Sequence, residues 1–280
     1  MFDALFTTTT EYKKLSHALS GKGACALFGL PASGRAQVYA ALCRQLDKPL
    51  CIVTPGEAEA TRFAADLNTL GIPAAVFPAR DYVLRPIEGT AREYEYRRLA
   101  VLGELVGGRL RAVAVPAEAL TQFTTPKEDF CANTRTLHAG DTLLRDDLLA
   151  ALFGAGYTRR AQVDGPGQFS VRGDIVDIFA PDQKMPVRME FWGDEIDTLH
   201  TFDLTTQRRE DAIDKFYLSP AREVLFGKPA DAAEQLRAFL AKQRGKKKTP
   251  MADCMAADLD LLDGGAVPVN MDKYLSLIHI

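Results

Sequence analysis

The segment Gly29–Ala36 has the glycine spacing of a phosphate-binding loop. In the pattern G-x-x-x-x-G-K-[ST], the lysine reaches the β- and γ-phosphates and the Ser or Thr hydroxyl ligates Mg²⁺. Gly29 and Gly34 are correctly spaced, but Arg35 stands at the lysine position and Ala36 at the hydroxyl position. Alanine has no oxygen for a metal, and arginine does not reproduce the compact lysine ammonium. We therefore expect a strand–turn–helix unit that no longer hydrolyses ATP, or a plain turn that needed two glycines.

A second group of candidate residues lies on the predicted strand Val187–Trp192. Successive side chains of a strand point to opposite faces, so the apolar residues 187, 189 and 191 are expected to face a core. Arg188 and Trp192 then share the outward face, with Cα atoms roughly 13 Å apart from the rise of a strand. The same alternation in Phe169–Arg172 predicts that Arg172 also points outward.

Two arginines and the only tryptophan of the chain on one outward face suggest a protein-binding surface. Arg and Trp are enriched at interface hot spots, where truncation typically costs about 2 kcal/mol or more. Arginine offers a planar fork for carboxylates, and tryptophan offers a rigid apolar anchor. A second interpretation stays open, in which Arg172 and Arg188 pair with Asp177 or Glu190 and Trp192 covers a small second core.

The remaining polar residues of this region do not indicate catalysis. The acidic residues between Asp174 and Asp197 fall on both strand faces and in turns, so we expect no metal site. Asp194-Glu195 follows Gly193 and is typical of a hairpin turn rather than of a second ATPase motif. The sequence has no G-x-G-x-x-G motif and no nucleophile–base pattern, so a small-molecule enzyme is disfavoured. We expect no catalytic residue, metal or cofactor here.

Composition limits the classes of partner. The 280 residues carry a net charge of −3, so the chain lacks the basic excess of a dedicated nucleic-acid-binding domain. No apolar run approaches the ~20 residues that span a bilayer, and the first residues do not resemble a secretory signal. These features predict a cytoplasmic protein with no membrane association.

Three regions follow from the pattern of predicted elements. Residues 1–130 alternate apolar runs and helical patterns, which predicts an α/β domain with a mostly parallel sheet covered on both faces. Its expected strands are Ala24–Phe28, Leu50–Thr54, Ala74–Phe77 and Ala112–Val115, with helices at Arg35–Leu46, Glu57–Leu70, Arg92–Val106 and after Pro116.

Residues 131–218 predict an α+β domain with an antiparallel meander. Its expected elements are a helix at Leu143–Phe153 and strands at Phe169–Arg172, Ile175–Phe179, Val187–Trp192 and Ile196–Phe202. Residues 219–280 are predicted to continue the first domain incompletely, with a helix at about Ala230–Gln243 and a basic linker at Arg244–Lys248.

Two stretches carry a family resemblance. The segments Gly167–Phe179 and Pro186–Asp197, with Phe202-Asp203 and Gln207-Arg208 behind them, resemble the strand motif shared by UvrB and the transcription-repair coupling factor (Mfd) family. UvrB keeps an intact P-loop, whereas Arg35 and Ala36 resemble the decayed loop of the coupling factors. The resemblance implies a degenerate P-loop domain, similar to UvrB and to helicases, with an inserted antiparallel UvrA-binding domain.

The function that the resemblance implies is recruitment of UvrA. The matching positions for UvrA contact are Arg172, Arg188 and Trp192, where the family has phenylalanine at the third position. The parent protein in this family is an ATP-dependent DNA translocase that releases RNA polymerase stalled at lesions and recruits nucleotide excision repair. ATP, Mg²⁺, RNA polymerase and double-stranded DNA are implied for its other domains. For this chain the resemblance implies a monomeric adaptor without enzymatic activity. The alternative is a UvrB-like ATPase subunit of the excision nuclease.

Overall fold

A computed structural model describes residues 7–21, 24–46, 48–80, 92–225, 229–242, 250–264, 268 and 271–274. The chain divides into two compact units. Unit 1 comprises Met1–Ala79 and Glu104–Gln122, and unit 2 comprises Arg80–Gly103 and Phe123–Ile280. The division at 1–130, 131–218 and 219–280 stays a prediction.

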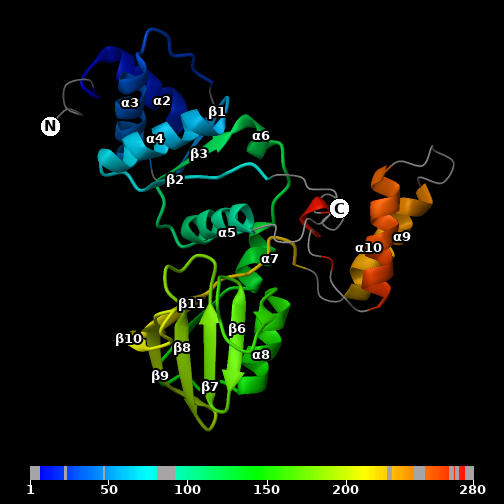
Figure 1. Ribbon diagram of the computed structural model, residues 1–280. Coiled ribbons are helices and arrows are strands. Elements are labelled where there is room, and N and C mark those ends of the chain that lie inside the picture. Colours follow the sequence, from blue (N-terminus) through cyan, green and yellow to red (C-terminus); the bar gives the residue numbers. More distant parts are fainter. Residues whose placement is uncertain are drawn as a thin grey trace. The chain divides into compact units, whose positions relative to one another are not determined.

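Unit 1 is built on a three-stranded parallel sheet (Figure 1). Its elements are α2 (Thr10–Ser20), α3 (Ala32–Gln45), β1 (Leu50–Thr54), α4 (Glu57–Thr69), β2 (Ala74–Val76), β3 (Ala112–Pro116) and α6 (Ala117–Leu120). The sheet order is β1-β3-β2, and both pairings are parallel. All five residues of β3 are buried, as expected for the central strand of a parallel sheet. The predicted β–α alternation is therefore confirmed for these elements.

The predicted strand at Ala24–Phe28 is wrong. These residues form no strand and are exposed, with Phe28 at 89%. An apolar run becomes a strand only when a neighbouring edge satisfies its backbone groups, and composition alone does not identify that neighbour. Within the described part of the chain, β1 pairs with β3 alone.

Unit 2 contains a six-stranded sheet and a separate two-stranded sheet. Its first elements are α5 (Glu93–Val106, of which residues up to Gly103 belong to this unit), α7 (Lys127–Ala132), β4 (Arg135–His138) and α8 (Arg145–Gly154). The strands that follow are β5 (Thr158–Arg159), β6 (Gln168–Arg172), β7 (Ile175–Phe179), β8 (Val187–Trp192), β9 (Glu195–Phe202), β10 (Arg209–Ala212) and β11 (Lys215–Leu218). The large sheet has the order β10-β9-β8-β7-β6-β5, and β11 pairs with β4. Strands β6 to β10 are consecutive antiparallel neighbours, so the predicted meander is confirmed.

Two tight turns and one helix organise this meander (Figure 1). Gly173 and Gly193 open the two-residue turns with φ values of 61° and 64°, a backbone conformation that glycine adopts without strain. Leu148 and Leu152 of α8 pack on one face of the sheet, in a core cluster with Met189 and other buried strand residues. We call this face the inner face and the opposite one the outer face.

Helix α5 is joined to the second part of unit 2 by buried contacts. The Arg98 guanidinium forms two hydrogen bonds of 2.9 Å with the Glu223 carboxylate, and Arg80 adds an ion pair of 2.7 Å. Burial alone would raise the pKa of Glu223, but the hydrogen bonds from Arg98 and the two positive charges lower it below its ordinary value. Tyr96 lies over Gly167, whose φ is 74°, so a Cβ there would come within 2.8 Å of the Tyr96 hydroxyl.

The last described elements of unit 2 are helical. They are α9 (Pro229–Lys242), α10 (Pro250–Asp263) and a 3₁₀ turn η1 (Met271–Tyr274), which share a small apolar core with Val224. The Tyr274 hydroxyl donates to Asp258 at 2.5 Å, and Lys273 lies 2.6 Å from the same carboxylate. The predicted basic linker Arg244–Lys248 lies outside the described residues. No helix in the described ranges is long and apolar enough to cross a membrane.

Candidate functional site

The sheet register brings the three predicted binding residues to the outer face of the meander. Arg188 is paired with Asp177 across β8 and β7, and Arg172 is paired with Ile175 across β6 and β7. The alternate residues of β8, with Met189 at their centre, are in the core under α8. Arg172, Arg188 and Trp192 therefore share one face, as the alternation predicted.

Both arginines bind the same buried carboxylate. Arg188 donates from Nε to Asp177 Oδ1 at 2.7 Å and from Nη2 to Oδ2 at 3.0 Å, which is a bidentate pair. Arg172 donates from Nη2 to Asp177 Oδ2 at 2.5 Å. Hydrogen bonding to Asp177 is the main reason that the pKa of Arg188 is raised. With one carboxylate between two guanidinium groups, the cluster carries a net positive charge.

Arg188 is covered on the outer face, contrary to the prediction of an open guanidinium. Its side chain is 11% exposed, against 45% for Arg172. The guanidinium carbon lies 4.7 Å from the centre of the Phe202 ring, and Nη1 donates to the Gln207 carbonyl at 3.2 Å. The interpretation in which the arginines pair with a nearby acid is therefore correct for both of them, whereas the expectation of exposure is correct for Arg172 alone.

The cover over Arg188 is a short loop after β9. Asp203 Oδ1 accepts hydrogen bonds from the Thr206 backbone N–H at 2.7 Å and from its hydroxyl at 2.9 Å. These bonds lower the pKa of the Asp203 carboxyl. Gln207 has a left-handed φ of 58°, which sequence alone did not indicate. Its side-chain amide donates to the Leu204 carbonyl at 2.8 Å, so the backbone that faces Arg188 is held in place.

Trp192 stands at the turn end of the outer face and is 82% exposed. It is the last residue of β8, opposite Glu195 at the β8–β9 hairpin. The outer face does have a second small core, formed by Val163, Phe179 and Phe202 with Leu204 against them. Because Trp192 is not part of it, the interpretation in which this indole covers a second core is wrong.

Glu190, the other acid considered as a partner, is engaged elsewhere. It forms an ion pair with Arg209 of β10, whose side chain is 47% exposed. Thr198 of β9 also donates to this carboxylate, at 3.4 Å. Arg209 therefore adds a second exposed arginine to the outer face, which strand spacing did not predict because β10 was not expected.

The candidate phosphate loop has a different local structure from the one its glycine spacing predicts. Gly29 has φ 81°, but α3 already begins at Ala32, two residues before Gly34, and the Arg35 N–H donates to the Pro31 carbonyl at 3.1 Å. The Arg35 guanidinium lies 4.0 Å from Glu59 of α4. Ala36 is 3% exposed and packs in the core between α3 and α4. Position 36 therefore faces the interior of unit 1.

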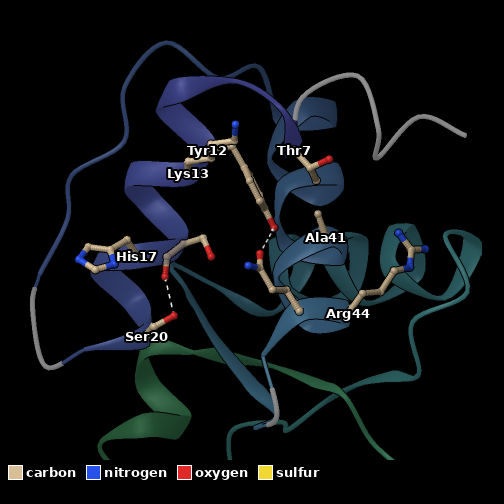
Figure 2. A pocket seen from close by; sticks show the side chains of 9 residues that line it. Thr7, Tyr12, Lys13, His17, Ser20, Ala41 and Arg44 are labelled. Atoms are coloured by element: carbon tan, nitrogen blue, oxygen red, sulfur yellow. Dashed lines mark hydrogen bonds between the residues drawn. The ribbon is translucent and has the colours of Figure 1, made fainter.

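A groove of about 710 Å³ lies between α2 and α3 (Figure 2). Its lining includes Lys13, His17 and Arg44, together with serine and tyrosine hydroxyls. Figure 2 shows His17 and Arg44 pointing away from each other, and Arg44 donates to the Leu70 carbonyl at 2.5 Å. Because the basic groups do not converge on one point, we assign no ligand to this groove.

Comparisons with known proteins match the segment that contains the three candidate residues. Residues 136–224 match the family described as the UvrB interaction domain. This segment includes β6 to β9 and all three candidate residues. The chain is 37% identical over 260 residues to a transcription-repair-coupling factor of Mycobacterium bovis, covering 89% of this chain and 20% of that protein. It is 27% identical over 262 residues to the same factor of Bacillus subtilis, covering 90% of this chain and 22% of that protein.

A UvrABC system protein B is also similar. The protein from Chlorobium limicola is 28% identical over 226 residues, covering 75% of this chain and 32% of that protein. The chain thus spans about a fifth of the length of the coupling factors it matches. Residues 136–224 match the UvrB interaction domain, and about nine tenths of the chain is similar in sequence to the transcription-repair-coupling factors.

Proposed function

We propose that this chain is a UvrA-recruiting adaptor module that docks on UvrA through the outer face of its antiparallel sheet. The observation that carries the proposal is the exposure of Trp192, at 82%, on the same face as the half-exposed Arg172. Both lie inside the segment that matches the UvrB interaction domain. Arg188 belongs to the same surface as a largely buried member.

The chemistry of this face suits a protein partner. The Trp192 indole is exposed to water at the end of a hairpin, so covering it with a partner lowers the free energy of the complex. Aromatic side chains are frequent anchors of interfaces. Only Nη2 of Arg172 donates to Asp177, so its other N–H groups are available to an acidic group of the partner. We therefore expect UvrA to present an apolar pocket beside an acidic group.

The wider role follows from the relatives and is part of the same proposal. In a complete coupling factor, UvrA recruitment would serve nucleotide excision repair after the release of stalled RNA polymerase. Translocation on double-stranded DNA, with ATP and Mg²⁺, would be carried out by a motor in the longer protein. We propose a cytoplasmic location and a monomeric chain.

The alternative is a UvrB-like ATPase, which the similarity to a UvrABC system protein B supports. Hydrolysis needs a phosphate-binding lysine and a hydroxyl that ligates Mg²⁺. Arg35 and Ala36 occupy those positions, and the Ala36 side chain is packed in the core of unit 1. We therefore prefer the adaptor, with a degenerate phosphate loop at Gly29, Gly34, Arg35 and Ala36.

Titration of the purified chain with UvrA tests the proposal. The wild-type chain should bind, Trp192→Ala should weaken binding by about 2 kcal/mol or more, and Arg172→Ala combined with Arg188→Ala should abolish retention on immobilised UvrA. Phe123→Ala is the matched control, since Phe123 is an aromatic residue 57% exposed outside the sheet. Equal retention of the double variant and the wild type would refute the adaptor, and ATP turnover that Arg35→Ala abolishes would favour the ATPase.

A further inference from the structure

We propose that Asp177 and Arg188 are positioning residues that fix the exposed Arg172 guanidinium for its partner, and that Arg188 itself makes no direct contact. This inference rests on the proposed docking function and assigns different roles to the two arginines of the docking face. It follows from the hydrogen bonds, the exposure and the covering of the three side chains.

Arg188 has few free donors for a partner. Each of its three guanidinium nitrogens already donates a hydrogen bond, two of them to Asp177 and one to the Gln207 carbonyl. One face of the guanidinium lies against the Phe202 ring, and the side chain is 11% exposed. A partner would have to displace the loop that Asp203 holds before it could reach this group.

Arg172 is in the opposite situation. Within the described part of the chain it donates from Nη2 alone, to Asp177, and its side chain is 45% exposed. The N–H groups of Nε and Nη1 therefore remain for acceptors of the partner, such as a carboxylate. Arg172 is the member of the pair that can contact UvrA.

Asp177 connects the two arginines. It is 1% exposed, so a partner cannot reach it, and its Oδ2 accepts from both Arg172 and Arg188. The bidentate pair with Arg188 fixes the plane of this carboxylate, and that plane fixes the direction of the Arg172 side chain. An arginine has many rotamers when free, so restraining it before binding lowers the entropic cost of docking.

A double-mutant cycle on UvrA affinity tests this assignment. Arg172→Ala should weaken binding about 30-fold or more, as for a hot-spot residue. Asp177→Asn should weaken it about fivefold to tenfold, within the coupling range of residues in contact. The proposal predicts that Asp177→Asn has no further effect once Arg172 is alanine. An undiminished loss in that background would show that Asp177 acts independently of Arg172 and would overturn the proposal.

Arg188→Lys provides a second variant if Asp177→Asn does not fold. Lysine keeps the positive charge but lacks the planar fork that holds the Asp177 carboxylate. We expect a loss of UvrA affinity of about fivefold that again disappears in the Arg172→Ala background. If Arg188 contacted UvrA directly, the loss would persist in that background.

The free chain gives a readout that does not depend on UvrA. In ¹⁵N NMR spectra, the Arg172 guanidinium should give restricted signals in the wild type and averaged signals in Asp177→Asn or Arg188→Lys. Unchanged Arg172 signals would overturn the positioning role even if UvrA binds. Conversely, a wild-type chain with restricted Arg172 signals and no affinity for UvrA would refute the docking function while leaving the Asp177 restraint in place.

Discussion

Arg98 and Glu223 stand 125 positions apart in the chain, and two hydrogen bonds of 2.9 Å join their fully buried side chains. Arg80 binds the same carboxylate, and the Thr124 hydroxyl donates to it at 2.6 Å. A buried ion pair contributes little net free energy compared with an apolar replacement, but removing one partner leaves a charge without compensation. The stability of the second half of unit 2 therefore depends on this buried contact with α5.

Glu223→Gln is expected to lower the free energy of unfolding by about 3–5 kcal/mol, because two buried arginines lose a charged carboxylate partner. Urea denaturation at neutral pH measures the change. Glu104→Gln is the matched control, since Glu104 pairs with Arg109 at 2.9 Å with both side chains more than a third exposed. The control should lose no more than about 1 kcal/mol. Equal losses in the two variants would contradict the role of burial.

The same carboxylate predicts a pH dependence of stability. The pKa of Glu223 is lowered in the folded chain relative to its ordinary value of 4.5. Its contribution is therefore fully present above that value and is lost as the pH falls below it, since protonation breaks the pairs with both arginines. Urea denaturation of wild type and Glu223→Gln should show a constant difference between pH 7 and 5.5 and a shrinking one at lower pH. A difference that grows with acidity would show that the sign is wrong.

Gly167→Ala should destabilise unit 2 more than Gly173→Ala. Both glycines have positive φ, so alanine adds about 1 kcal/mol of backbone strain at either position. Only at Gly167 would the new methyl group also meet the Tyr96 side chain, whereas Gly173 has open space. Thermal denaturation should rank the two variants in this order. In a Tyr96→Ala background, the added cost of Gly167→Ala should fall to that of Gly173→Ala.

Trp192→Ala should leave stability within about 0.5 kcal/mol of the wild type, because the side chain contributes little to any core. The indole is 82% exposed and lies outside both apolar clusters of the sheet. Thermal denaturation of the variant, compared with Met189→Ala from the core side of the same strand, separates binding from folding. A large loss of stability in Trp192→Ala would show that the indole is a packing residue and would weaken the docking proposal.

The antiparallel meander could be predicted from the sequence in detail. Strands β7 and β8 have the predicted bounds, and the alternation in β8 correctly placed Met189 inside and Trp192 outside. In a meander each strand pairs with its neighbour in the chain. The alternation of apolar and polar residues and the glycines of the turns are therefore sufficient to predict the strands and their faces. The outward direction of Arg172 and Arg188 followed from the same rule.

The features that were missed depend on segments distant in sequence. Arg188 is covered by a loop whose left-handed Gln207 carries no signal in the sequence. The strand expected at Ala24–Phe28 required a partner edge that composition does not specify, and α10 was not among the predicted helices. The exposure of Arg188 could not be predicted from the alternation of side chains along β8. Alternation gives the face to which a side chain points, but not whether another segment covers it.

The order β1-β3-β2 in unit 1 has a consequence for how the chain assembles. β1 and β2 are synthesised before β3 and do not pair with each other. Each of them pairs with β3, where Ala112 lies between Leu50 of β1 and Ala74 of β2. Such long loop closures slow folding, whereas the sequential hairpins of the meander close locally. On the ribosome, we therefore expect the sheet of unit 1 to stay incomplete, with two separate edges able to aggregate, until the segment after Arg111 has emerged.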